Sequence, residues 1–126
     1  KVKKEFAHVC FAHGDFVSWN TRIAKNCLWV FDWEFSLSQS PRGLDLLHFL
    51  VWPWVVTGEG DLGERWQEFR SKCITLGWDT DQNTLKWLFA FMRGHWLGLL
   101  TGEYPGDAIF ERMLEVEEFS LKIGET

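Results

Sequence analysis

The chain has 126 residues, 46% of them hydrophobic, and a formal net charge of −5. This length favours a single domain, and the hydrophobic content excludes a disordered chain. The acidic balance argues against a nucleic-acid-binding surface and against a polybasic membrane anchor. The longest apolar stretch, residues 44–56, is too short to cross a bilayer, so we expect no membrane span.

Short apolar runs predict strands in the first third of the chain. Residues 9–12 and 28–31 are each predicted to be a buried strand. Residues 21–24 and 28–31 flank Lys25-Asn26, which favours a hairpin with a two-residue turn. Asn20 starts this small β-hairpin and Asp32 ends it. Residues 1–7 are predicted to end a helix, and the polar segment 36–41 is predicted to be a loop.

Helical patterns occupy the remainder of the chain, so the predicted fold class is α+β, mainly helical. A first helix follows Pro41, and Pro53 should end or kink it near Trp52. The third helix is apolar around much of its circumference, and we expect it to be the central buried helix. The other bounds, set by capping residues and glycines, are Asp61 to Leu76 before Gly77, then Thr80 or Asp81 to Leu99, and last Asp107 to Lys122.

The three cysteines indicate a compartment. Cys10, Cys27 and Cys73 are an odd number, and they lack paired or zinc-binding spacing. Reduced thiols of this kind are typical of a cytoplasmic protein, which is the location we expect.

Three oxygen-bearing side chains are expected to meet where the predicted strands end. Asp15 precedes Asn20 by five residues, and Asp32 follows Asn20 by twelve. Carboxylate and amide oxygens suit a hard cation such as Mg²⁺, which proteins hold with one or two carboxylates plus substrate phosphates. The pattern therefore favours a magnesium site over one built from histidine and cysteine.

The run His13-Gly14-Asp15-Phe16-Val17-Ser18-Trp19-Asn20, followed by Asp32-Trp33-Glu34, carries a family resemblance. It resembles the catalytic and metal-binding segments of the aminoglycoside phosphotransferase and choline kinase family, the small-molecule branch of the kinase-like fold. The resemblance covers roughly residues 8–50. This chain has Ser18-Trp19 where the family often has Pro-Gly, which leaves the metal ligands intact.

This resemblance implies a phosphotransferase that uses Mg²⁺ and ATP, or another nucleoside triphosphate, to phosphorylate a hydroxyl of a small molecule. Asp15 would be the catalytic base, and Asn20 and Asp32 would hold the metal. Glu34 would reach a second metal ion or brace the loop. His13 and Asp45 would brace the catalytic loop, with the acceptor lying against residues 45–60 and 85–100.

The resemblance also implies a domain assignment. Residues 1–126 would form the C-terminal lobe of a kinase-like fold, with a catalytic loop at 13–20, a metal loop at 32–34 and a helical subdomain at 43–123. The sequence lacks the glycine-rich loop and strand lysine of an N-terminal nucleotide-binding lobe. We therefore expect this isolated chain to be inactive, to bind ATP weakly or not at all, and to self-associate through apolar surface that the missing lobe would cover.

Simpler interpretations remain for single residues. Asp45 could be an ordinary acidic residue of a first helical turn, and His13 could be a structural hydrogen-bonding residue, a base or a ligand. Arg93 and His95 could be a structural pair or bind substrate. Glu115, Glu117 and Glu118 are most simply a solvated face.

Two other functions compete with the phosphotransferase. One is a non-catalytic kinase-like module used for binding or interaction. The other is a metal-dependent hydrolase built from His8, His13, Asp15 and Asp32. His8 and His13 are five residues apart, so on a strand they would point to opposite faces, which argues against the hydrolase.

Overall fold

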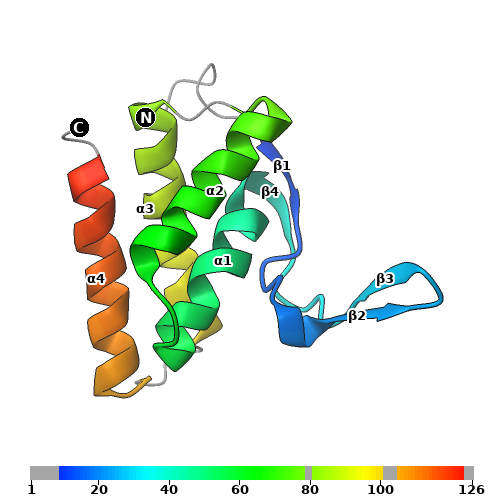
Figure 1. Cartoon of the computed structure of the whole chain (residues 1–126). Helices are drawn as coiled ribbons and strands as arrows, with labels where there is room; N and C mark the ends of the chain where they lie inside the picture. The colour runs from blue at the N-terminus through cyan, green and yellow to red at the C-terminus, as the bar shows by residue number, and fades with distance from the viewer. Residues whose placement is uncertain (1–8, 79–80, 101–104, 124–126) are drawn as a thin grey trace.

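A computed structural model of the chain describes residues 9–78, 81–100 and 105–123. Within them, four helices pack together on one side and two separate two-stranded antiparallel sheets lie on the other (Figure 1). The predicted class, α+β and mainly helical, is confirmed. The expectations for residues 1–7 and for Thr80 as a cap lie outside the described residues.

The predicted hairpin is present. Strands β2 (Thr21–Ala24) and β3 (Cys27–Val30) pair antiparallel, with Thr21 opposite Val30. The turn residues Lys25 and Asn26 have φ values of 52° and 60°, the left-handed conformation that a two-residue hairpin turn requires. Figure 1 shows this hairpin projecting away from the helices.

The prediction that the early strands are buried is wrong. Strand β1 (Val9–Ala12) buries only Ala12, and Leu28 and Trp29 of β3 are more than half exposed. The hairpin projects from the helices and no described element covers it, so Ile23, Leu28 and Trp29 are exposed. Further exposed apolar side chains in the same part of the chain are Val9, Phe11, Trp19, Ile23, Phe31 and Trp33. The expected self-association through this surface stays a prediction.

The segment 36–41, predicted to be a loop, is mostly a strand. Strand β4 (Leu37–Pro41) pairs antiparallel with β1, so that Val9 lies opposite Pro41 and Cys10 opposite Ser40. The polar composition suggested a loop, but β1 supplies the backbone partners and no apolar run is needed on an exposed edge. Pro41 ends the strand, where its missing N–H costs least.

The helices are α1 (Leu44–Thr57), α2 (Leu62–Leu76), α3 (Gln82–Leu99) and α4 (Asp107–Ile123). Asp61 caps α2 by accepting a hydrogen bond from the Glu64 N–H, and Asp81 caps α3 through the Thr84 N–H. Gly77 ends α2 with a positive φ. The predicted bounds of α2, α3 and α4 are confirmed to within one residue. None of the described helices is long and apolar enough to cross a bilayer.

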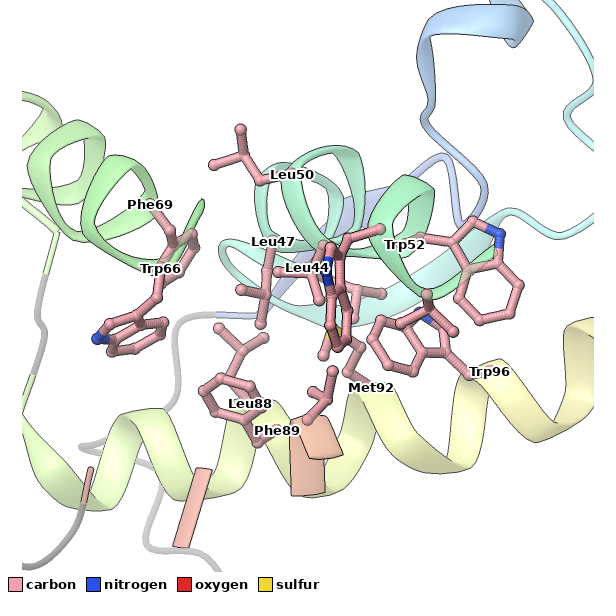
Figure 2. Close-up of a cluster of buried hydrophobic side chains, with 14 of the residues drawn as sticks. Leu44, Leu47, Leu50, Trp52, Trp66, Phe69, Leu88, Phe89, Met92 and Trp96 are labelled. Atoms are coloured by element: carbon pink, nitrogen blue, oxygen red, sulfur yellow. The ribbon is translucent and has the colours of Figure 1, made fainter. Parts of the chain in front are cut away.

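The first helix, α1, is the central one. It contacts α2, α3 and α4, whereas α3 buries one face and exposes residues such as Lys86 and Ala90 on the other. The expectation that α3 would be the central buried helix is therefore wrong. In Figure 2, Leu44 and Leu47 of α1 lie above Leu88 of α3, with α2 at one end of the cluster and Trp96 at the other.

Pro53 does not end α1, which continues for another turn to Thr57. Proline removes one backbone hydrogen bond from a helix interior, and packing on three neighbouring helices outweighs that loss. The Thr57 hydroxyl supports the last turn by donating to the Pro53 carbonyl oxygen at 2.7 Å. The first two turns of α1, before Pro53, carry Asp45 and His48, which contact the loop at 13–20.

Candidate functional site

The loop between β1 and the hairpin turns sharply at Gly14. This residue has a φ of 89°, in a region that side chains other than glycine rarely adopt. A Cβ atom here would lie 2.0 Å from the carbonyl oxygen of Phe35. The segment after β3 therefore packs directly on the loop backbone, and only glycine fits between them.

Two helices hold this loop in place. The carboxylate of Asp45, in the first turn of α1, accepts hydrogen bonds from the backbone N–H groups of His13 (2.8 Å) and Gly14 (3.1 Å). These are the contacts that the family resemblance implied for Asp45. From α3, His95 donates its ring N–H to the Gly14 carbonyl oxygen at 2.5 Å. The loop conformation is therefore determined by residues from distant parts of the chain.

His13 is buried and uses both ring nitrogens inside the site. Its Nδ1 accepts the Asp15 backbone N–H at 3.1 Å, and its Nε2–H donates to the Phe31 carbonyl oxygen at 2.7 Å. Trp33 packs edge-on against the ring, with centroids 4.5 Å apart. His13 therefore links the loop at 13–20 to the segment that contains Phe31 and Trp33. Because both ring nitrogens are engaged, it has no free lone pair for a metal ion.

This arrangement also weighs against the hydrolase alternative. That hypothesis needed His13 as a metal ligand, and both of its ring nitrogens are engaged in protein hydrogen bonds. His8, the second histidine it invoked, lies outside the described residues. The remaining members, Asp15 and Asp32, are oxygen donors, which favours a hard cation over zinc.

Asp15 presents a partly exposed carboxylate at the centre of the site. Its Oδ1 accepts the His48 Nε2–H at 2.9 Å, and its Oδ2 lies 3.3 Å from the Asn20 amide nitrogen. Asn20 also donates to the Asp15 backbone carbonyl oxygen at 2.9 Å. The hydrogen bond from His48 lowers the pKa of the Asp15 carboxyl below its usual value, and Asn20 acts in the same direction against burial. Asp15 is therefore ionised at neutral pH and able to accept a proton.

Sequence reasoning missed His48 as a residue of this site. It lies on α1 three residues after Asp45, so both side chains project from one face of the helix toward the loop. The spacing of three residues between Asp45 and His48 could have indicated His48. It does so only if Asp45 is already known to contact the loop. The imidazole is 1% exposed, and burial lowers its pKa below the usual value even beside the Asp15 carboxylate.

The lowered pKa of His48 predicts an acid-sensitive fold. As pH falls below 6.5, the ordinary value, the unfolded chain binds this proton before the folded chain does. The free energy of unfolding should therefore be independent of this group above pH 6.5 and decrease below it. The lowered pKa of Asp15 should add a second loss below pH 3.8, its ordinary value.

The substitution His48→Gln provides the test. Glutamine can still donate a hydrogen bond to Asp15 but does not titrate, so the loss beginning near pH 6.5 should shrink. Urea unfolding at several pH values between about 7.5 and 5, which bracket the histidine range, measures it. Equal pH dependence in the variant and the wild type would assign the acid sensitivity to other groups.

Asn20 and Asp32 are brought near one another by the hairpin. The Phe31 N–H donates to the Asn20 carbonyl oxygen at 2.8 Å, which continues the β2–β3 ladder by one step. Paired Cα atoms are about 5 Å apart and consecutive ones 3.8 Å, so the Cα atoms of Asn20 and Asp32 lie within about 10 Å. Asp32 itself has a φ of 61°, an uncommon conformation that often marks functional positions.

The free groups at this end of the hairpin fit a hard cation. The Asn20 side-chain nitrogen faces Asp15, which leaves the side-chain oxygen Oδ1 without a partner among the described residues. The Asp32 side chain likewise makes no hydrogen bond or ion pair with the described residues. Across those residues there is no cluster of three or more His, Cys, Asp or Glu side chains able to hold a metal. A cation here would therefore need ligands from a bound phosphate, as Mg²⁺ often does. Glu34 is exposed, and its role stays a prediction.

Arg93 and His95 do not form a pair with each other. Arg93 is exposed and forms an ion pair with Glu117 of α4, while His95 contacts the loop. Arg93 and Glu117 border a hollow of about 290 Å³ between α3 and α4, whose apolar wall includes Trp96. None of Asp15, Asn20 and Asp32 lines this hollow.

No known protein family, curated protein or solved structure matches this chain. The functional assignment therefore depends on the motif residues and on the contacts that they make. Those contacts join Asp15, Asn20, His13 and Asp45 in one hydrogen-bonded site, with the backbone of Asp32 alongside.

Proposed function

We propose that this chain is the catalytic part of an ATP-dependent phosphotransferase that acts on a hydroxyl of a small molecule, built on a kinase-like C-terminal lobe. One observation carries the proposal: the ionised Asp15 carboxylate is held by two hydrogen-bond donors, in a loop whose backbone Asp45 clamps. A carboxylate positioned in this way suits a base that orients and deprotonates a hydroxyl.

In the proposed reaction, Asp15 accepts a hydrogen bond from the acceptor hydroxyl. The hydroxyl oxygen forms a bond to the γ-phosphorus of ATP while the bond from that phosphorus to the bridging oxygen breaks, releasing ADP. The hydroxyl proton passes to Asp15 and from there to solvent. This chemistry depends mostly on positioning and electrostatics, which is why the clamping of the loop matters.

Asn20 and Asp32 would hold Mg²⁺ through their side-chain oxygens, which are free of other described partners. The ion, when bound, would neutralise negative charge on the phosphates. Glu34, two residues further on, would serve a second metal ion or brace the segment. The remaining metal ligands would come from phosphate and water.

The substitution Asp32→Asn tests the metal site. In the full-length gene product it should weaken magnesium-dependent nucleotide binding at least tenfold, about 1.4 kcal/mol, because the ligand loses its charge. Isothermal titration with and without Mg²⁺ measures this effect. Asp61→Asn is the matched control, since asparagine also caps a helix well and Asp61 lies in the α2 cap. Equal affinity in wild type and Asp32→Asn would remove Asp32 from the metal site.

A non-catalytic interaction module is the second candidate. The exposed apolar residues of β1 and the hairpin favour it, because contiguous apolar surface marks interaction sites. Titration of the 126-residue chain with Mg-ATP shows whether this chain binds nucleotide by itself. Weak or absent binding is expected from the missing glycine-rich loop and strand lysine. Tight, magnesium-dependent binding would show that the chain is self-sufficient for nucleotide.

The acceptor position near residues 45–60 and 85–100 stays a prediction. The hollow between α3 and α4 is lined in part by residues of the second range. Trp96 lines this hollow, and it is connected to the Asp15 carboxylate only through His48 along the hydrogen-bond chain. An acceptor hydroxyl must reach Asp15 directly, so we do not assign this hollow to the acceptor.

A further inference from the structure

A chain of two hydrogen bonds runs from the helical core to the Asp15 carboxylate. Trp96 of α3 donates its indole N–H to Nδ1 of His48 at 2.9 Å, and Nε2 of His48 lies 2.9 Å from Oδ1 of Asp15. His48 and Trp96 are 1% and 2% exposed. Neither residue belongs to the motif.

The indole determines the proton position on His48. An indole nitrogen only donates hydrogen bonds, so Nδ1 of His48 must be the unprotonated, accepting nitrogen. The single proton of the neutral imidazole then lies on Nε2 and points at Asp15. A second proton would have to go on Nδ1, where it would face the Trp96 N–H, one donor against another. Trp96 therefore opposes protonation of His48 by geometry as well as by burial.

The charged and titratable groups around His48 act in both directions. Asp15 from the loop and Asp45 from α1 favour an imidazolium, while burial and His95 from α3 oppose it. On the remaining sides, the ring stacks on Trp52 at 5.5 Å between centroids and lies 6.3 Å from Trp96. Burial is the largest of these influences.

We propose that His48 and Trp96 are positioning residues: Trp96 orients the His48 ring, and His48 engages Oδ1 of Asp15, which presents Oδ2 as the oxygen that receives the acceptor proton. Oδ2 has only the Asn20 amide beside it, at 3.3 Å, a long and weak contact. The assignment of a receiving oxygen rests on the proposed phosphotransferase function. The proton arrangement of His48 does not, and it can be measured without nucleotide or acceptor.

The first test is nuclear magnetic resonance on the 126-residue chain. Long-range ¹⁵N–¹H spectra should show His48 as the neutral Nε2–H tautomer at neutral pH. Trp96→Phe removes the indole donor and keeps an aromatic ring, so His48 should then become protonated at higher pH than in wild type. A wild-type Nδ1–H tautomer, or an unchanged His48 titration in Trp96→Phe, would overturn the arrangement.

A matched pair at position 48 tests the link to Asp15. His48→Gln keeps an N–H donor for Oδ1, whereas His48→Leu removes the donor and keeps an apolar side chain. The ¹³C chemical shift of the Asp15 carboxyl at neutral pH should change in His48→Leu, which loses the donor to Oδ1, and stay near wild type in His48→Gln. Equal chemical shifts in the two variants would refute the link. If Trp96→Phe fails to fold, the tautomer of His48 in the wild type still tests the indole contact, and this pair tests the link to Asp15.

Activity of the full-length gene product supplies the last readout. His48→Leu should lower kcat by about 10–100-fold, the usual effect of losing an orienting partner, with KM little changed, and His48→Gln should recover most of that loss. If the Asp15 carboxyl responds to His48→Leu but no acceptor is ever phosphorylated, the positioning stands and the phosphotransferase proposal falls. If phosphorylation occurs and both variants keep wild-type kcat, the positioning proposal falls alone.

Discussion

Asp15→Asn should lower turnover of the full-length gene product by a factor of about 10²–10⁴, the usual contribution of a general base. The asparagine side chain is isosteric with aspartate and can still accept the His48 hydrogen bond, but it cannot take a proton. Nucleotide affinity should stay near wild type, because Asn20 and Asp32 are the proposed metal ligands. The measurement is steady-state phosphoryl transfer together with equilibrium nucleotide binding.

The control for this experiment is again Asp61→Asn, which removes a carboxylate of the same kind from the α2 cap. It should leave kcat and nucleotide affinity unchanged. Phosphoryl transfer at near wild-type rate in Asp15→Asn would contradict the assignment of Asp15 as the base. Loss of nucleotide binding in the same variant would instead place Asp15 among the groups that hold the metal or the phosphates.

Gly14→Ala should destabilise the fold by roughly 3 kcal/mol. A side chain at positive φ costs about 1–2 kcal/mol, and overpacking costs about 1–3 kcal/mol more. The second contribution is specific to this site, because the new Cβ atom would lie 2.0 Å from the Phe35 carbonyl oxygen. Relief of that overlap must move either the loop at 13–20 or the segment that begins at Asp32, so activity should fall with stability.

Gly106→Ala is a closely matched control for the backbone contribution. Gly106 has a φ of 94°, against 89° for Gly14, and a Cβ atom there would meet no atom of the described residues within 4 Å. Urea unfolding should therefore show a loss of only about 1–2 kcal/mol in Gly106→Ala. Equal losses in the two variants would mean that the packing of Phe35 on the loop contributes nothing measurable.

Local chemistry was enough to predict several elements. Asp61 and Gly77 set the ends of α2 because a side-chain cap and a left-handed glycine satisfy the groups that a helix leaves unpaired. The turn at Lys25-Asn26 was predictable because few residue pairs tolerate two consecutive positive φ values. Each of these signals acts over a few residues, so the amino-acid order alone carries it.

Strand pairing and burial required the tertiary structure. Leu37–Pro41 is a strand only because β1, more than twenty residues earlier, supplies its hydrogen-bond partners. The hairpin strand Cys27–Val30 is apolar yet exposed, because burial depends on what covers a strand and no described element covers this one. The central place of α1 likewise follows from its three helical neighbours, which hydrophobic content by itself could not reveal.

Some residues of the candidate site could be predicted from the sequence, and others were found only in the tertiary structure. The sequence by itself determined which residues carry the motif, Asp15, Asn20 and Asp32, because their types and spacing are local properties. Only the tertiary structure showed that His48 contacts Asp15 and that Trp96 contacts His48. His48 is 33 positions from Asp15, and Trp96 is a further 48 positions from His48. Side chains so distant in sequence meet only after α1 and α3 have packed against each other and against the loop.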